Sequence, residues 1–176
     1  MHPQCREFLE RTKAKFPINF AGVTVLEIGS YNINGSVREH FPDPKEYIGV
    51  DLMPGPGVDL VGEGQRIQFA RQFDTVISTE CFEHNPYWAG TFRNMVKHTR
   101  PGGLVVMTCA STGRAPHGLS TKNPDDSPGT LSKGWDHYEN LTAESFAHMP
   151  IEEWFSDHEF EYNPTSCDLY FWGVKR

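Results

Sequence analysis

The chain has 176 residues (20.0 kDa), enough for one domain with a single continuous core. Its 38% hydrophobic content indicates a globular protein, and no apolar run approaches the ~20 residues of a membrane span, so we expect a cytoplasmic protein with no membrane partner. The net charge of −7 disfavours nucleic acid as a partner, because proteins that bind it gain affinity by neutralising phosphates.

The first half of the chain predicts helices and strands in alternation. Residues 4–16 carry apolar side chains at helical spacing, and the β-branched run 23–30 ends in a glycine turn, which is typical of a buried strand. The other elements expected here are a short helix over 36–41, strands over 47–52 and 58–61, and a helix over 65–72.

The second half continues this alternation and then breaks it. We expect a strand over 73–78, a helix over 87–99 and a strand over 104–110. Residues 111–138 are rich in Gly, Pro, Ser, Asp and Asn, which predicts a loop or lid on the substrate side. The last expected elements are a helix over 142–156 and two closing strands, FEYNP and DLYFWGVK.

Strands separated by helices favour right-handed βαβ units and a mostly parallel sheet. The apolar runs are continuous rather than alternating, so both faces of the sheet should be covered. The sequence therefore predicts one α/β domain over residues 1–176, with a doubly wound sheet of seven strands that ends in an antiparallel C-terminal hairpin.

Residues at the ends of the first two strands suggest a nucleoside site. Gly29 follows the first strand, where a glycine lets the backbone turn sharply and approach a ligand. Asp51 ends the second strand, where a carboxylate can accept hydrogen bonds from both hydroxyls of a ribose. Because the carboxyl ends of parallel strands meet at one edge of the sheet, these residues should converge.

Four segments also resemble, in order, the motifs of class I S-adenosylmethionine-dependent methyltransferases. They are VLEIGSYNINGSVREHF, YIGVDLMPGPGVDLVGEG, FDTVISTECFEH and RPGGLVVMTC, and they cover about residues 20–110. NGSVR and PGPGVD are similar to a methyltransferase type 11-like subgroup. The resemblance implies a Rossmann-like fold, S-adenosyl-L-methionine as cofactor, and methyl transfer to an oxygen or nitrogen of a small-molecule substrate.

The resemblance also implies roles for individual residues. It places the methionine part of the cofactor at the first loop, the ribose at Asp51, the adenine near Glu63, and the reacting methyl group near the end of the fourth strand. The implied cofactor-binding residues are Glu27, Gly29, Ser30, Tyr31, Asn34, Asp51, Leu52, Met53, Glu63, Gly64, Ser78, Thr79 and Glu80. Tyr31 and Ile33 replace two glycines of the family pattern, which leaves the path of the first loop open and weakens a dinucleotide-binding alternative.

Three histidines are candidates for a catalytic base: His84, His117 and His137. His84 belongs to an E-H pair that resembles one in the family, although a structural role at a helix start fits it equally well. The other two lie in the 111–138 loop, whose segment WDHYENLT resembles part of small-molecule methyltransferases and whose Trp135 could instead fill the core. The sequence does not rank the three.

Two further features receive a structural interpretation. Asn85-Pro86-Tyr87-Trp88 resembles the N-P-P-Y signature of enzymes that methylate flipped bases, but it comes too late after the strand, so we expect a loop and a helix start. The four cysteines (Cys5, Cys81, Cys109 and Cys167) are scattered, which predicts free thiols and no metal site.

Three function classes remain open: a small-molecule methyltransferase, a non-catalytic domain that binds the cofactor or regulates a partner, and a nucleotide-sugar or dinucleotide enzyme on a similar sheet. The second is suggested by the small size of the chain, which leaves no room for a separate substrate domain.

Overall fold

The computed structural model describes residues 2–176. Their seven strands form one sheet with the order β3-β2-β1-β4-β5-β7-β6. Neighbouring strands from β3 to β5 pair in parallel, whereas β7 pairs antiparallel with both β5 and β6. This topology confirms the predicted doubly wound sheet and its antiparallel C-terminal hairpin. The strands are β1 (Thr24–Ile28), β2 (Glu46–Asp51), β3 (Leu60–Val61), β4 (Phe73–Thr79), β5 (Thr99–Ala110), β6 (Phe155–Asn163) and β7 (Asp168–Lys175).

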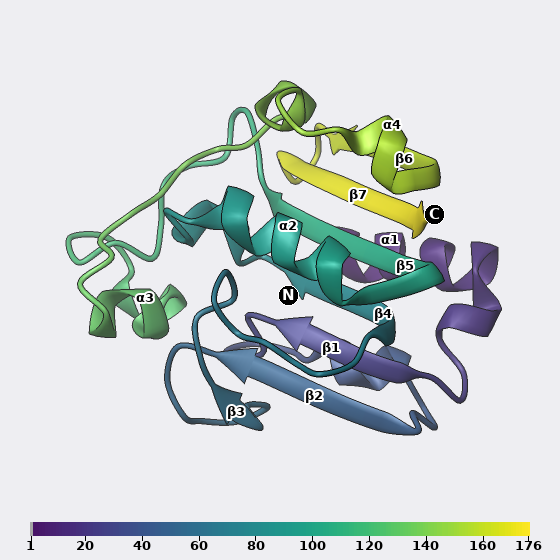
Figure 1. Ribbon diagram of the computed structural model, residues 1–176. Helices are drawn as coiled ribbons and strands as arrows, with labels where there is room; N and C mark the ends of the chain where they lie inside the picture. Colours follow the sequence, from purple (N-terminus) through teal and green to yellow (C-terminus); the bar gives the residue numbers. More distant parts are fainter. Residues whose placement is uncertain (1) are drawn as a thin grey trace.

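Helices cover both faces of the sheet, as its continuous apolar strands require (Figure 1). Helix α1 (Pro3–Lys15) packs on one face through Phe8 and Leu9, and Phe8 stacks on Tyr170 of β7 with ring centroids 4.6 Å apart. Helix α2 (Trp88–His98) covers the other face, where the ring of Phe92 packs against those of Phe146 and Phe171. The central strands are therefore buried by apolar side chains on both faces of the sheet.

The carboxyl ends of β1, β2 and β4 meet at one edge of the sheet, and the 111–138 loop gathers beside it (Figure 1). This loop contains the short helix α3 (Pro128–Ser132), which follows a 3₁₀ turn at Pro124–Asp126. We call residues 124–135 the α3 segment. The topology therefore brings the polar strand ends and the predicted loop together.

The helix predicted over 65–72 was wrong: this described segment forms a single turn and then runs irregularly. The turn is closed by bonds from the Arg66 and Ile67 N–H groups to the Glu63 carbonyl, and other backbone groups bond to side chains of α2. The Asn94 amide donates to the carbonyls of Gly64 (2.7 Å) and Ile67 (2.8 Å), and the Phe69 N–H donates to the ring of His98 (3.1 Å). These long-range bonds replace the ladder that a helix would need.

The single helix predicted over 142–156 was also wrong. The segment forms a 3₁₀ turn (Ala143–Phe146) and a four-residue helix, α4 (Ile151–Trp154), separated by residues 147–150, which include Pro150. Proline lacks the N–H that a continuing helix would bond, so it divides the stretch. The expected short helix over 36–41 is present as a 3₁₀ turn, Val37–His40. No helix within residues 2–176 is long and apolar enough to cross a bilayer.

Candidate functional site

Asp51 lies at the carboxyl end of β2 and faces a cavity at the edge of the sheet. Its carboxylate accepts hydrogen bonds from the backbone N–H groups of Tyr31 (2.9 Å) and Leu52 (2.7 Å). Burial raises the pKa of the carboxyl and these amides oppose the rise. The two bonds fix the carboxylate between the β1 and β2 loops, where its remaining lone pairs can accept from a ligand.

Gly29 makes the sharp turn at the end of β1. Its φ of +82° lies in the left-handed region, and a Cβ there would come within 2.6 Å of the Cys81 Sγ atom. Its N–H donates to the Val50 carbonyl (2.9 Å), which holds the turn against β2. Glycine is therefore required here both by the backbone conformation and by the space beside Cys81.

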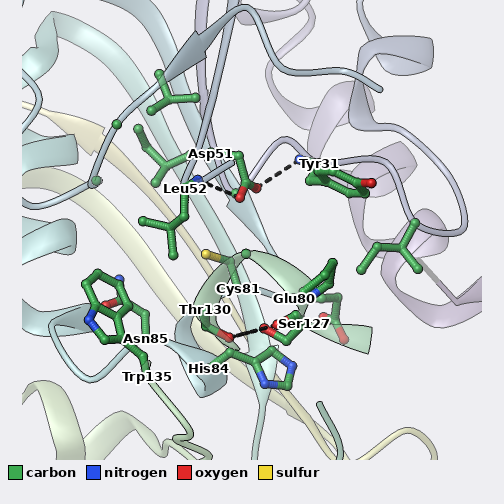
Figure 2. A pocket seen from close by; sticks show the side chains of 18 of the residues that line it. Tyr31, Asp51, Leu52, Glu80, Cys81, His84, Asn85, Ser127, Thr130 and Trp135 are labelled. Atoms are coloured by element: carbon green, nitrogen blue, oxygen red, sulfur yellow. Dashed lines mark hydrogen bonds between the residues drawn. The ribbon is translucent and has the colours of Figure 1, made fainter. Parts of the chain in front are cut away.

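The first cavity has a volume of about 90 Å³ and lies between the strand ends and the α3 segment. Figure 2 shows Asp51 and Tyr31 on one side of it and His84, Ser127 and Thr130 on the other. The α3 segment rests directly on the β2 end, since a Cβ on Gly129 would lie 2.9 Å from the Asp51 Oδ1 atom. Binding sites for small molecules usually measure ~300–1,000 Å³, so this segment fills room that a ligand would need.

The second cavity, about 260 Å³, adjoins the first through shared walls that include Gly29, Tyr31, Glu80 and His84. Glu27 lies at its side with 3% of its surface exposed and accepts a hydrogen bond from the Tyr47 hydroxyl (2.8 Å). Burial raises the pKa of Glu27 to about 7, although the bond from Tyr47 opposes this. The carboxyl therefore titrates near neutral pH.

Glu80 ends β4 in the left-handed region, with φ +51°. Its carboxylate accepts from the Thr108 hydroxyl (2.8 Å) and pairs with His2 at the start of α1 (3.0 Å). The same His2 nitrogen lies 3.0 Å from the buried Asp168 carboxylate. Hydrogen bonds to Asp168 and Glu80 raise the pKa of His2 to about 10, so the imidazole is charged at neutral pH.

We expect His2→Ala to lower the free energy of unfolding by about 1–2 kcal/mol at pH 7. The loss is smaller than the pKa shift alone would give, because solvent partly screens the pair. The folded-state pKa of about 10 exceeds the ordinary 6.5, so the contribution is complete below pH 6.5 and is lost as the pH rises through about 10. Urea unfolding at pH 7 and above pH 10 measures this difference. His158→Ala is the matched control, because its partner Glu152 is 88% exposed; an equal loss in both variants would contradict the prediction.

The structure brings two of the predicted base candidates together. The rings of His84 and His117 have centroids 4.9 Å apart, and Tyr138 packs against both. Burial, together with the nearby His117 and His137, lowers the pKa of His84 to about 3, which keeps its imidazole neutral. His117 lines the second cavity, whereas His137 lines neither cavity and lies 3.8 Å from Glu139.

Most of the residues predicted to bind cofactor line one cavity or both. Met53, Glu63 and Ser78 do not: Glu63 pairs with Arg66 at 3.3 Å, and Ser78 is buried beneath the Gly29 turn. Those that line a cavity are Glu27, Gly29, Ser30, Tyr31, Asn34, Asp51, Leu52, Gly64, Thr79 and Glu80.

Sequence reasoning missed several cavity residues because they come from distant parts of the chain. His2 and Arg114 both reach the second cavity and converge on Asp168, with Arg114 3.4 Å from its carboxylate. Asn85 was interpreted as part of a loop, which is confirmed, but it also lines the first cavity and its amide donates to Thr91 (2.9 Å). No local pattern marked these residues as cavity residues.

Comparison with known proteins gives a family match over most of the chain. Residues 1–162 match the family described as a methyltransferase domain. No curated protein matches the sequence.

Solved structures share the fold at low sequence identity. The N-methyltransferase NodS from Bradyrhizobium japonicum WM9, in complex with S-adenosyl-L-homocysteine, has a TM-score of 0.64 and 16% identity, covering 99% of this chain and 88% of that chain. The 1,6-didemethyltoxoflavin-N1-methyltransferase from Burkholderia thailandensis has a TM-score of 0.65 and 14% identity, with coverages of 97% and 77%. Phosphoethanolamine N-methyltransferase 2 from Haemonchus contortus, with S-adenosyl-L-methionine, has a TM-score of 0.62 and 17% identity, with coverages of 94% and 52%.

Proposed function

The chain belongs to the methyltransferase-domain family, whose methyl donor is S-adenosylmethionine, and we propose that it methylates an oxygen or nitrogen of a small-molecule acceptor. The observation that carries this proposal is the Asp51 carboxylate, which the β1 and β2 loops hold at the mouth of the first cavity. Three similar structures are of N-methyltransferases, which supports nitrogen as one of the two acceptor atoms.

The residues present fit an S-adenosyl group. Asp51 can accept from ribose hydroxyls, and Leu52 and Val50 offer an apolar surface for an adenine ring. Gly64 also lines this cavity, and it must be glycine because a Cβ there would lie 2.7 Å from Ile28 and 2.9 Å from Thr91. Glu27 lies at the second cavity, where its carboxylate can pair with the ammonium of the methionine part. The α3 segment must move away from Asp51 to admit the nucleoside.

The cofactor, when bound, supplies an electrophilic methyl group on a sulfonium. The chain's own residues position the two reactants: Asp51 holds the sugar, Glu27 the amino acid end, and the α3 segment closes over the donor and excludes water. His84 and His117 face the second cavity, where we place the acceptor: His117 can bind its polar group or its proton, and the neutral imidazole of His84 can bind its polar group. His137 is the weakest of the three candidates because it lines neither cavity.

The proposed function is tested by incubating the chain with S-adenosylmethionine labelled in its methyl group and a panel of small amines and alcohols. Transfer of label to an acceptor, and its loss in Asp51→Ala, is the expected result. Tight cofactor binding without any transfer across the panel and a cell extract would favour the non-catalytic alternative. Label found only on nucleic acid would contradict the proposed acceptor class.

We expect S-adenosylhomocysteine to bind about eightfold more weakly at pH 6.0 than at pH 7.5, because Glu27, with a pKa of about 7, must be ionised to pair with the ligand's ammonium. The raised pKa means that the carboxyl is mostly neutral at pH 6.0 and mostly ionised at pH 7.5. Calorimetric titration across this range measures the effect. Glu27→Gln should bind more weakly with a flat profile, and an equally steep profile in that variant would contradict the assignment.

A further inference from the structure

Three side chains that can ligate a metal meet beside the second cavity. One ligand atom from each of Glu83, His84 and His117 lies within 4.8 Å of the other two. Glu83 and His84 follow the end of β4, whereas His117 comes from the 111–138 loop. The sequence predicted no metal site because the third residue is more than thirty positions away from the first two.

The Glu83 carboxyl is buried without a side-chain partner in the described part of the chain, and the donors that approach it are the backbone N–H groups of Glu83 and Ala110. Its exposed fraction is 0%, and no cationic side chain among the described residues pairs with either oxygen. The His84 Nδ1 atom is likewise buried and unpartnered within residues 2–176. A fully buried carboxyl is stable either as the neutral acid or when a cation pairs with its ionised form, so this position can accept a positively charged ion.

The two imidazoles are held in place, His117 by a hydrogen bond through its second ring nitrogen and His84 by packing. The His117 Nδ1–H donates to the Ala115 carbonyl (3.1 Å), which leaves Nε2 free to ligate. Gly118 packs against His84, where a Cβ would lie 2.6 Å from its Cε1 atom, and Tyr138 packs on both rings. These contacts restrict the rotation of both rings while leaving the cavity side of the cluster open.

We propose that Glu83, His84 and His117 bind a divalent transition-metal ion of the zinc class at the wall of the second cavity. Two imidazoles and one carboxylate are a donor set that suits Zn²⁺, whereas Mg²⁺ prefers oxygen ligands alone. Three protein ligands leave at least one coordination position for water or substrate, as in catalytic rather than structural zinc sites.

The neighbouring cluster of His2, Glu80 and Asp168 has similar residue types but is already paired. Its single imidazole bonds both carboxylates at 3.0 Å, and Arg114 adds a second positive charge 3.4 Å from Asp168. The carboxylates of this cluster are therefore already paired with positively charged side chains, whereas no such side chain among the described residues pairs with Glu83. This difference assigns the ion to the Glu83 cluster.

The role of the ion rests on the proposed function, although its presence does not. At the cavity wall it would bind a hydroxyl, carboxylate or amine of the acceptor and hold that group facing the methyl donor. The acceptor class this favours is a small molecule with two adjacent polar groups, one to bind the ion and one to receive the methyl group.

Titration of Zn²⁺ into the metal-stripped full chain, without cofactor or acceptor, tests the site directly. We expect one ion per chain, and affinity at least ~100-fold lower in Glu83→Gln and in His117→Ala, since each removes a direct ligand. His158→Ala should bind within about twofold of the wild type, because His158 lines neither cavity, and His2→Ala should still bind one ion because its own cluster does not supply the ligands. The visible absorption of bound Co²⁺ should disappear in the same two ligand variants.

Circular dichroism of each variant establishes that it is folded; Gln has nearly the shape of Glu, and His117 is only half-buried. Failure to bind an ion stoichiometrically, unchanged affinity in both folded ligand variants, or loss of binding in His2→Ala alone would overturn the proposal. Metal binding with these dependences but no methyl transfer would leave the site standing and contradict the proposed function instead.

Discussion

Replacing Asp51 with alanine is expected to weaken the binding of S-adenosylhomocysteine at least ~100-fold. Hydrogen bonds to a charged acceptor contribute about 1.5–3 kcal/mol each, and Asp51 is placed to accept from both hydroxyls of a ribose. The variant also leaves the N–H groups of Tyr31 and Leu52 without their acceptor, which loosens the loop that borders the cavity. Isothermal titration calorimetry at pH 7.5 measures the change.

Two companion variants separate a site effect from a general loss of negative charge. Asp157→Ala removes an exposed carboxylate on β6, far along the chain from the cavity, and should bind normally. Asp51→Asn keeps one carbonyl acceptor and should give intermediate affinity. Unchanged affinity in a folded Asp51→Ala protein would contradict both the site and the proposed function.

Replacing Gly29 with alanine is expected to lower the free energy of unfolding by about 2–4 kcal/mol, combining the strain of a positive φ with overpacking against a buried neighbour. At φ +82° a Cβ would lie 2.6 Å from the Cys81 Sγ atom and 2.7 Å from its Cβ atom. Relief requires the β1 turn to move away from the β4 loop, so cofactor affinity should fall as well. Urea unfolding and calorimetry measure the two effects.

Gly134→Ala is a matched control, since Gly134 has φ +73° but no atom within 4 Å of a built Cβ. It should show only the backbone strain, about 1 kcal/mol. Adding Cys81→Ala to Gly29→Ala should recover part of the lost stability, and this coupling isolates the contact. Equal losses in Gly29→Ala and Gly134→Ala, with no coupling to Cys81, would show that the contact is unimportant.

The fold was largely predictable because its strands are continuous apolar runs bounded by turn residues. All seven strands were expected, with differences in their ends: β5 begins five residues before the predicted start, and β6 begins at Phe155. The two wrong helices fail for different reasons. Pro150 divides one locally, whereas the backbone of residues 65–72 bonds to Asn94 and His98, which no local pattern reveals.

The site was predictable where a residue's position follows from the end of a strand. Gly29 and Asp51 reach the cavity because β1 and β2 end there, so the topology alone brings them together. His2 reaches Glu80 only because α1 packs across the sheet, 78 positions away in the chain. The meeting of His117 with Glu83 depends likewise on the path of a long loop, which local sequence does not determine.

The close packing of Gly129 on Asp51 has a consequence for the turnover rate. The first cavity, which we propose for the nucleoside, lies beneath the α3 segment, whereas the second cavity is the larger of the two. Each round of turnover must therefore include an uncovering step, before the spent nucleoside can leave and a fresh donor can enter. If that step is slower than the chemistry, product release limits turnover, and substitutions that loosen or tighten the packing of the α3 segment on Asp51 would alter the steady-state rate without touching a reacting atom.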